Sequence, residues 1–190
     1  MKNQESKSIY ENTRAADWDM SGYKKVFGFE ENDLRGKKIL DIGGGKAAFQ
    51  EEALKSGIDV VSIDPLYGDS IKFDGSQKAL KAAAVNEALP FQRDTFDLVL
   101  ANCSSFYYIY QHYLFKQGLE EAISKGLLML NQITNVLRDK GEAMLSFSSE
   151  YLPVFERILE EFKKNNSGTE AKIIESAGDT SLSIFFIKKQ

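Results

Sequence analysis

The stretch ILDIGGGKAAF at residues 39–49 constrains the fold more than any other part of this chain. A short apolar run ends in three successive glycines, and apolar residues then recur at helical spacing. This order predicts a buried strand, a glycine loop and a helix. Because glycine lets a backbone turn tightly and lets a ligand come close to it, the loop is the first place to expect a binding site.

Further segments repeat this alternation of strand and helix. Strands are predicted at 37–43, 59–65, 84–87, 95–102 and 141–148, with two more within 170–189. Helices are predicted at 46–57, within 76–91 and at 150–165, together with a mainly helical region that runs to Arg138. The alternation indicates a single α/β domain over 1–190, with helices on both faces of a sheet and a polar leader at 1–22. The last two strands flank a tight Gly-Asp turn and are expected to pair antiparallel.

Composition limits which kinds of ligand and partner the chain is expected to bind. The net charge is −4 and the isoelectric point is about 5.2, so no global positive field favours nucleic acid or an anionic membrane. A single cysteine, Cys103, and a single histidine, His112, rule out a cysteine-cluster or histidine-rich metal centre, and no metal is expected. No apolar stretch resembles a signal peptide or a membrane span. A cytoplasmic monomer or homodimer is therefore expected.

The glycines alone leave the ligand open. Gly43, Gly45 and Ala48 fit the fingerprint G-x-G-x-x-G/A of nicotinamide dinucleotide folds, so an NAD(P)-dependent oxidoreductase is one interpretation. Asp41 argues against it, because a carboxylate at about 4 Å would repel a pyrophosphate by ~1–4 kcal/mol. A cationic ligand would be attracted instead. S-adenosylmethionine carries a sulfonium and an ammonium group and no phosphate.

Three segments together carry a resemblance. ILDIGGGKAAF, then DVVSIDP, then NEALPFQRDTFDLVLANCSSFY resemble class I S-adenosylmethionine-dependent methyltransferases in order and spacing over about 37–147. The resemblance implies a Rossmann-like, doubly wound, mostly parallel seven-stranded sheet with an antiparallel final strand. It also implies S-adenosylmethionine as the cofactor and S-adenosylhomocysteine as the product.

The resemblance also implies roles for individual residues. Asp41 would hold the methionine amino group, Asp64 the ribose hydroxyls, and the loop backbone would close on the cofactor. Because Val85 stands where the family often has an acid that binds adenine, Asn86 or Glu87 would take that contact. The implied cofactor-binding set is Asp41, Gly43, Gly44, Gly45, Asp64, Pro65, Asn86, Glu87 and Asn102. Ala47 replaces the family's third glycine.

The acceptor side is expected in the leader and in residues 103–138. Six phenylalanine and tyrosine residues, together with His112, crowd 106–115, either as a core-facing stripe or as the wall of a hydrophobic pocket. The residues expected there are Cys103, Tyr107, Tyr108, Tyr10 and Trp18, the last two as parts of a lid, and His112 is the one candidate general base. Cys103 fits a small buried hydrophobe better than a nucleophile.

The function predicted from these residues is methyl transfer to a small hydrophobic or aromatic acceptor by in-line displacement. The alternatives are the oxidoreductase and a non-catalytic relative that keeps the fold as a binding module, to which Ala47 and Val85 lend support.

Overall fold

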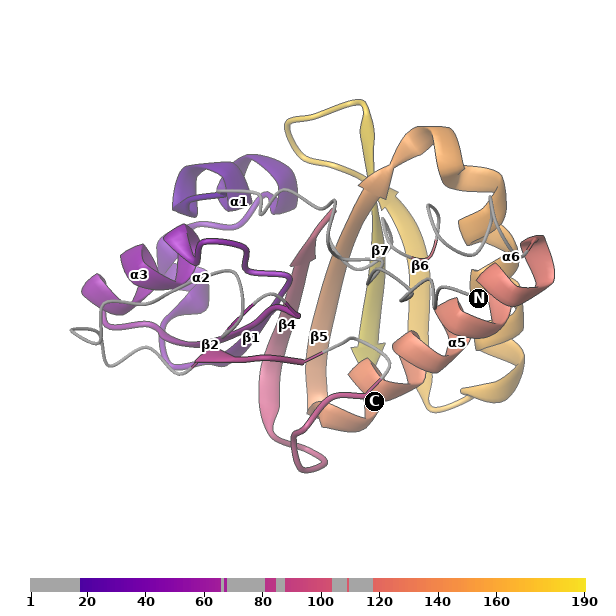
Figure 1. Ribbon diagram of the computed structural model, residues 1–190, viewed down its shortest axis with the longest axis horizontal. Coiled ribbons are helices and arrows are strands. Elements are labelled where there is room, and N and C mark those ends of the chain that lie inside the picture. Colours follow the sequence, from indigo (N-terminus) through magenta and orange to yellow (C-terminus); the bar gives the residue numbers. More distant parts are fainter. Residues whose placement is uncertain (1–17, 66, 68–80, 85–87, 104–108, 110–117) are drawn as a thin grey trace, which may run out of the picture.

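The computed structural model describes residues 18–65, 67, 81–84, 88–103, 109 and 118–190. Seven strands form one sheet in the order β3-β2-β1-β4-β5-β7-β6 (Figure 1). The strands are β1 (Lys38–Ile42), β2 (Asp59–Ile63), β3 (Lys81–Ala82), β4 (Phe96–Asn102), β5 (Leu137–Ser148), β6 (Thr169–Glu175) and β7 (Leu182–Lys189).

All strand pairs from β3 to β5 are parallel, and β7 runs antiparallel to both β5 and β6. The predicted mostly parallel, seven-stranded sheet with a reversed final strand is confirmed. The helices are α1 (Met20–Phe27), α2 (Glu31–Leu34), α3 (Ala48–Lys55), α5 (Leu119–Val136) and α6 (Leu152–Asn165), with a short 3-10 helix, η2, at Ser149–Tyr151.

The helices cover both faces of the sheet. On one face, buried side chains of α1, α2 and α3 pack with Ile39, Val60, Leu98 and Leu100. On the other face, α5 and α6 pack on the strand residues that alternate with these. Because side chains of a strand point to opposite faces in turn, one short apolar run supplies both cores.

Two predicted boundaries were wrong. β3 is Lys81–Ala82, paired with Ser62 and Ile63, where the alanine-rich run predicted a helix followed by a strand at 84–87. Ala84 lies beyond β3, and 85–87 lie outside the described residues. Pairing with the edge of β2 outweighs the helix propensity of lysine and alanine there. The connection between β6 and β7 spans 176–181 and is wider than the tight turn expected.

Three other elements shift at their ends. The leader expected at 1–22 already becomes helical at Met20, where α1 starts. α3 starts at Ala48 because Ala47 has left-handed backbone angles. β5 starts at Leu137, since the Arg-Asp-Lys-Gly segment expected to close the preceding helix forms an irregular start to the strand, with a register shift against β4. Within the described part of the chain, no helix is long and apolar enough to cross a bilayer.

Candidate functional site

Polar side chains gather on one face of the sheet where the parallel strands end. Asp41, Ser62, Asn102 and Ser146 continue the alternation that places Ile39, Val60 and Leu100 on the α1–α3 face, and all four are buried. Asp41 lies opposite Ser62 in the register of β1 and β2, and Asn102 lies opposite Ser146 in that of β4 and β5. The sheet thus carries two polar pairs at its carboxyl end.

Asp41 is fully buried, and both of its carboxylate oxygens accept hydrogen bonds. The Tyr23 hydroxyl donates to Oδ1 at 2.5 Å, and the Ser62 hydroxyl donates to Oδ2 at 2.7 Å. Burial raises the pKa of Asp41 to about 6, and the charge of Asp64 raises it too, while the two hydroxyl donors lower it. The Tyr23 and Ser62 hydroxyls are neutral donors, so they stabilise the ionised carboxylate without supplying a positive charge.

The glycine loop closes directly over this carboxylate. Gly43 and Gly45 have φ of 73° and 54°, which favour glycine. The N–H groups of Gly43 and Gly44 donate to the Ile63 carbonyl at 2.7 and 3.2 Å. A Cβ on Gly44 would lie only 2.6 Å from Asp41 Oδ2, so the loop depends on glycine at this position. The sequence pattern predicted a glycine loop, but it did not predict that Asp41 excludes a side chain at Gly44.

Asp64 follows β2 and lies beside the same loop. Its Oδ2 accepts a hydrogen bond from the Gly45 N–H at 3.1 Å, and the residue is buried to all but 6% of its surface. Pro65, which comes next, is half-buried. Ala47 has φ of 68°, the backbone conformation that a third glycine would adopt without strain. The chain therefore keeps the loop geometry with an alanine in it.

Asn102 and Cys103 lie at the end of β4. The Ser146 hydroxyl donates to Asn102 Oδ1 at 2.7 Å and accepts from the Cys103 N–H at 2.8 Å. Asn102 Nδ2 has no hydrogen-bond partner among the residues that the structure describes. Burial raises the pKa of the Cys103 thiol, so the thiol stays protonated near neutral pH and is a poor nucleophile.

Sequence patterns missed the third component of the site, helix α1. Tyr23, which the sequence places just past the polar leader, is 2% exposed, and its ring stacks on Phe49 of α3 with centroids 4.1 Å apart. The Trp18 carbonyl accepts the Phe49 N–H at 3.0 Å, and the Met20 N–H donates to Glu52. The one available signal was an aromatic residue at the start of a short amphipathic helix. Its contact with Asp41 depends on the tertiary fold.

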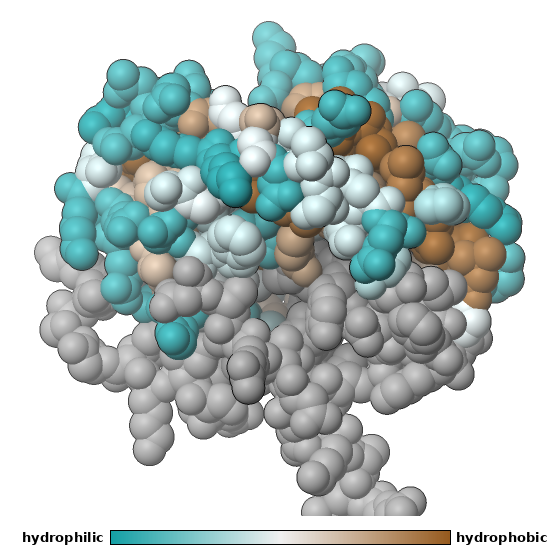
Figure 2. Space-filling view, turned by 90° about the horizontal axis from the view of Figure 1, so that it is seen from above, coloured by the Kyte–Doolittle hydropathy of each residue, from teal (hydrophilic) through white to brown (hydrophobic). Residues whose placement is uncertain are grey.

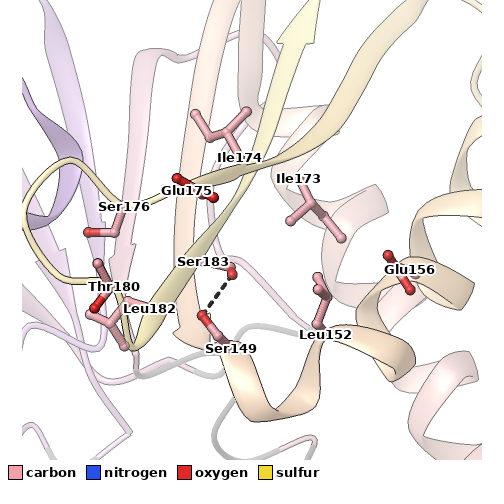
Figure 3. A pocket seen from close by; sticks show the side chains of 10 residues that line it. All are labelled: Ser149, Leu152, Glu156, Ile173, Ile174, Glu175, Ser176, Thr180, Leu182 and Ser183. Carbon is pink, nitrogen blue, oxygen red and sulfur yellow. Dashed lines mark hydrogen bonds between the residues drawn. The ribbon is translucent and has the colours of Figure 1, made fainter.

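A groove of about 470 Å³ opens at the same end of the sheet, beyond η2 and between α6 and the β6–β7 connection. Figure 3 shows Glu156 and Glu175 on either side of it, with the Ser149 and Ser183 hydroxyls joined at 2.9 Å. Leu152, Ile173 and Leu182 supply aliphatic walls. Figure 2 looks down on this end of the molecule, and the hydrophobic surface gathers on the side where α6 and β6 lie.

The structure brings together some of the predicted site residues and does not describe others. Those brought together at the carboxyl end are Asp41, Gly43, Gly44, Gly45, Asp64, Pro65, Asn102 and Cys103. Trp18 is 37% exposed, and its ring packs over Gly22. Six lie outside the described residues: Tyr10, Asn86, Glu87, Tyr107, Tyr108 and His112. The described residues contain no group of three or more histidine, cysteine or acidic side chains placed to hold a metal ion.

Comparison with known proteins gives the class of fold. No protein-family model and no curated protein matches the sequence. Among solved structures, the plantazolicin methyltransferase BpumL in complex with S-adenosylhomocysteine matches with a TM-score of 0.57 and 14% identity, over 90% of this chain and 80% of that one. An S-adenosylmethionine-dependent methyltransferase from Mesorhizobium loti matches at 0.54 and 12%, over 85% and 94%.

A protein from Pyrococcus horikoshii OT3 matches at 0.57 and 14%, over 81% of this chain and 82% of that one. The chain therefore has the fold of class I S-adenosylmethionine-dependent methyltransferases.

Proposed function

We propose that this chain binds S-adenosylmethionine and transfers its methyl group to a small acceptor with a hydrophobic or aromatic part. The observation that carries the proposal is the pair of buried carboxylates, Asp41 and Asp64, held against one glycine loop at the carboxyl end of the parallel strands. In open α/β sheets this is the end where ligands bind. The fold, which the methyltransferases above share, agrees with it.

The residues present fit the amino-acid end of this cofactor. Asp41 accepts two hydroxyl hydrogen bonds, and a carboxylate has about four acceptor positions, so an ammonium group can still be bound. Both hydroxyl donors are neutral, and the neighbouring Asp64 adds a second negative charge. This surrounding favours a cation and opposes the pyrophosphate of a dinucleotide.

The nucleoside end is assigned to the other side of the loop. Asp64 would accept from the ribose hydroxyls, with its carboxylate oriented by the Gly45 N–H. Pro65 would flank the adenine. Asn86 or Glu87 would bind the adenine amino group, in place of the acid that is missing at Val85.

When bound, the cofactor supplies a methyl group activated by the positive charge of a sulfonium. The chain's contribution is to orient the acceptor and exclude water. Asn102 would orient the acceptor, because Ser146 engages its amide oxygen and its amide nitrogen has no partner in the described structure. Cys103 would line the same space as a neutral thiol, and His112 would take a proton where the acceptor must lose one.

The acceptor is assigned to the side of the sheet where β4 and β5 end. Tyr107, Tyr108, Tyr10 and Trp18 would supply aromatic contacts to it. The aliphatic walls of the groove beyond η2 support an acceptor with an apolar part, and its two carboxylates oppose an acidic one.

Calorimetry with S-adenosylhomocysteine tests the proposal. We expect binding in the micromolar range, and Asp64→Asn should weaken it at least tenfold, because a hydrogen bond to a charged group is worth about 1.5–3 kcal/mol. Asp59→Asn is the matched control, since Asp59 is an exposed aspartate at the opposite end of β2. Equal affinity in wild type and Asp64→Asn would contradict the ribose assignment.

Two outcomes would point to the alternative functions. Thermal stabilisation by NAD(P) without stabilisation by S-adenosylmethionine would indicate a dinucleotide enzyme. Binding of S-adenosylhomocysteine with no methyl transfer to any member of a broad acceptor set would indicate a non-catalytic relative.

A further inference from the structure

Helix α1 contacts the proposed cofactor site through the hydroxyl oxygen of Tyr23. The Tyr23 hydroxyl donates to Asp41 Oδ1 across 18 residues of sequence, and the tyrosine is buried. Burial and the charge of Asp41 hold the pKa of Tyr23 well above its usual range, so Tyr23 remains a donor at every pH of interest.

The ring of Tyr23 is held independently of that hydroxyl. It is nearly parallel to the Phe49 ring, at 3°, and it also contacts Phe27 of its own helix with centroids 5.7 Å apart. Aromatic stacking and burial fix the ring, and the ring aims the hydroxyl at Asp41. Loss of the oxygen alone would therefore leave the packing of α1 in place.

Helix α1 is itself tied to both sides of the site. The Met20 N–H donates to Glu52 of α3 at 2.9 Å. At its other end, the Val26 carbonyl accepts from the Ala177 N–H and the Ser176 hydroxyl of the β6–β7 connection, at 3.1 and 2.9 Å. The yellow connection in Figure 1 reaches across to α1 for this contact. The Tyr23 hydroxyl is thus delivered by a helix anchored at two points.

We propose that Tyr23 is a positioning residue that holds the Asp41 carboxylate under the glycine loop and so sets the affinity for the ammonium group of the cofactor. This inference rests on the proposed function. Tyr23 acts only through Asp41 and needs no contact with the cofactor.

The charges around Asp41 give the inference a pH dependence. In the described part of the chain, the titratable groups that face Asp41 are Tyr23 from α1 and, after β2, Asp64 and Tyr67. Asp64 raises the pKa of Asp41, and the Tyr23 and Ser62 hydroxyls lower it. Without the Tyr23 hydroxyl the pKa of Asp41 rises above about 6, and a neutral carboxyl binds an ammonium poorly.

The test is Tyr23→Phe, with the dissociation constant of S-adenosylhomocysteine measured by calorimetry from pH 5.5 to 8.5. If the Tyr23 hydrogen bond changes the ionisation constant of Asp41 about tenfold, its loss raises the pKa of Asp41 by about one unit. Tyr23→Phe should then bind S-adenosylhomocysteine about fivefold more weakly than wild type at pH 6 and nearly as tightly at pH 8.5. A merely structural role would weaken binding by the same factor at every pH.

Two controls sharpen the test. Methylthioadenosine keeps the nucleoside and the sulfur but lacks the amino-acid part, so Tyr23→Phe should not change its affinity at any pH. Tyr151→Phe removes a tyrosine hydroxyl from η2, away from Asp41, and should leave both ligands unaffected.

The experiment distinguishes a failure of the proposed function from a failure of the role proposed for Tyr23. If S-adenosylhomocysteine does not bind wild type, the proposed function is wrong. If it binds wild type and Tyr23→Phe shows the same profile as wild type, or loses methylthioadenosine equally, the inference is overturned. Should Tyr23→Phe fail to fold, Ser62→Ala removes the other donor to Asp41 and must show the same pH-dependent loss.

Discussion

The two polar pairs at the end of the sheet are built alike and differ in charge. In each, a serine on one strand donates to a side chain directly opposite on its neighbour: Ser62 to Asp41, and Ser146 to Asn102. The first pair is acidic and receives a second donor from α1. The second pair is neutral and leaves an amide nitrogen without a partner in the described structure.

Because of this difference in charge, the two pairs suit different parts of the bound ligands. A buried carboxylate attracts a cation strongly, whereas a buried amide orients a neutral group without attracting charge. The acidic pair therefore suits the charged end of the cofactor, and the neutral pair suits the region where the methyl group would meet its acceptor. Variants that change one pair and spare the other test this contrast.

The largest expected effect is on cofactor affinity when the acidic pair loses its charge. Asp41→Asn should weaken S-adenosylhomocysteine binding at pH 7.5 at least about thirtyfold, since removing one partner of a buried charge pair costs about 2–5 kcal/mol. Calorimetry measures this directly. Methylthioadenosine affinity should stay within about threefold, since its binding needs no ammonium site. An equal loss for both ligands would mean that Asp41 supports the loop and does not bind the cation.

The next effect is on stability and depends on pH. The pKa of Asp41 is about 6 in the folded protein against 3.8 in an unfolded chain, so between these values the folded state holds more protons. Unfolding free energy contributed by Asp41 is therefore fully present below pH 4 and falls as the pH rises through 6.

The ligand-free Asp41→Asn variant should gain stability over wild type as the pH rises from 4 to 7. The gain should be on the order of 2 kcal/mol in urea unfolding, because each pKa unit corresponds to about 1.4 kcal/mol. If the difference in unfolding free energy between the two proteins does not change with pH, burial does not raise the pKa of Asp41.

The smallest effect concerns the neutral pair. Ser146→Ala leaves the Asn102 amide oxygen and the Cys103 N–H without their shared partner, and should lower the unfolding free energy by about 1–2 kcal/mol. Its S-adenosylhomocysteine affinity should stay within about twofold of wild type over the whole pH range. A pH-dependent loss like that expected for Ser62→Ala would erase the contrast between the pairs.

The sequence predicts the frame of this site because its signals are local. The apolar runs, the three glycines and the aspartates at 41 and 64 lie within short stretches, and the alternation of strand and helix orders them. The α1 contribution is not local. Tyr23 meets Asp41 only when the chain between them folds back, and nothing in its neighbours marks that contact.

The serines are missed for a related reason. Ser62 and Ser146 look like ordinary polar residues in strands, and their roles follow from register, which pairs each with one residue of a strand distant in sequence. The prediction for β3 is wrong for another reason. Lysine and alanine carry no strand preference, and only pairing with the edge of β2 selects the extended conformation there.

A crystal structure of the full chain with S-adenosylhomocysteine tests directly whether Asp41 binds the ammonium group and Asp64 the ribose. We expect the amino group of the ligand within hydrogen-bond distance of Asp41, with the Tyr23 hydroxyl still bonded to Oδ1, and both ribose hydroxyls on Asp64. A ligand whose amino group lies away from Asp41, or whose ribose leaves Asp64 without contact, would contradict it.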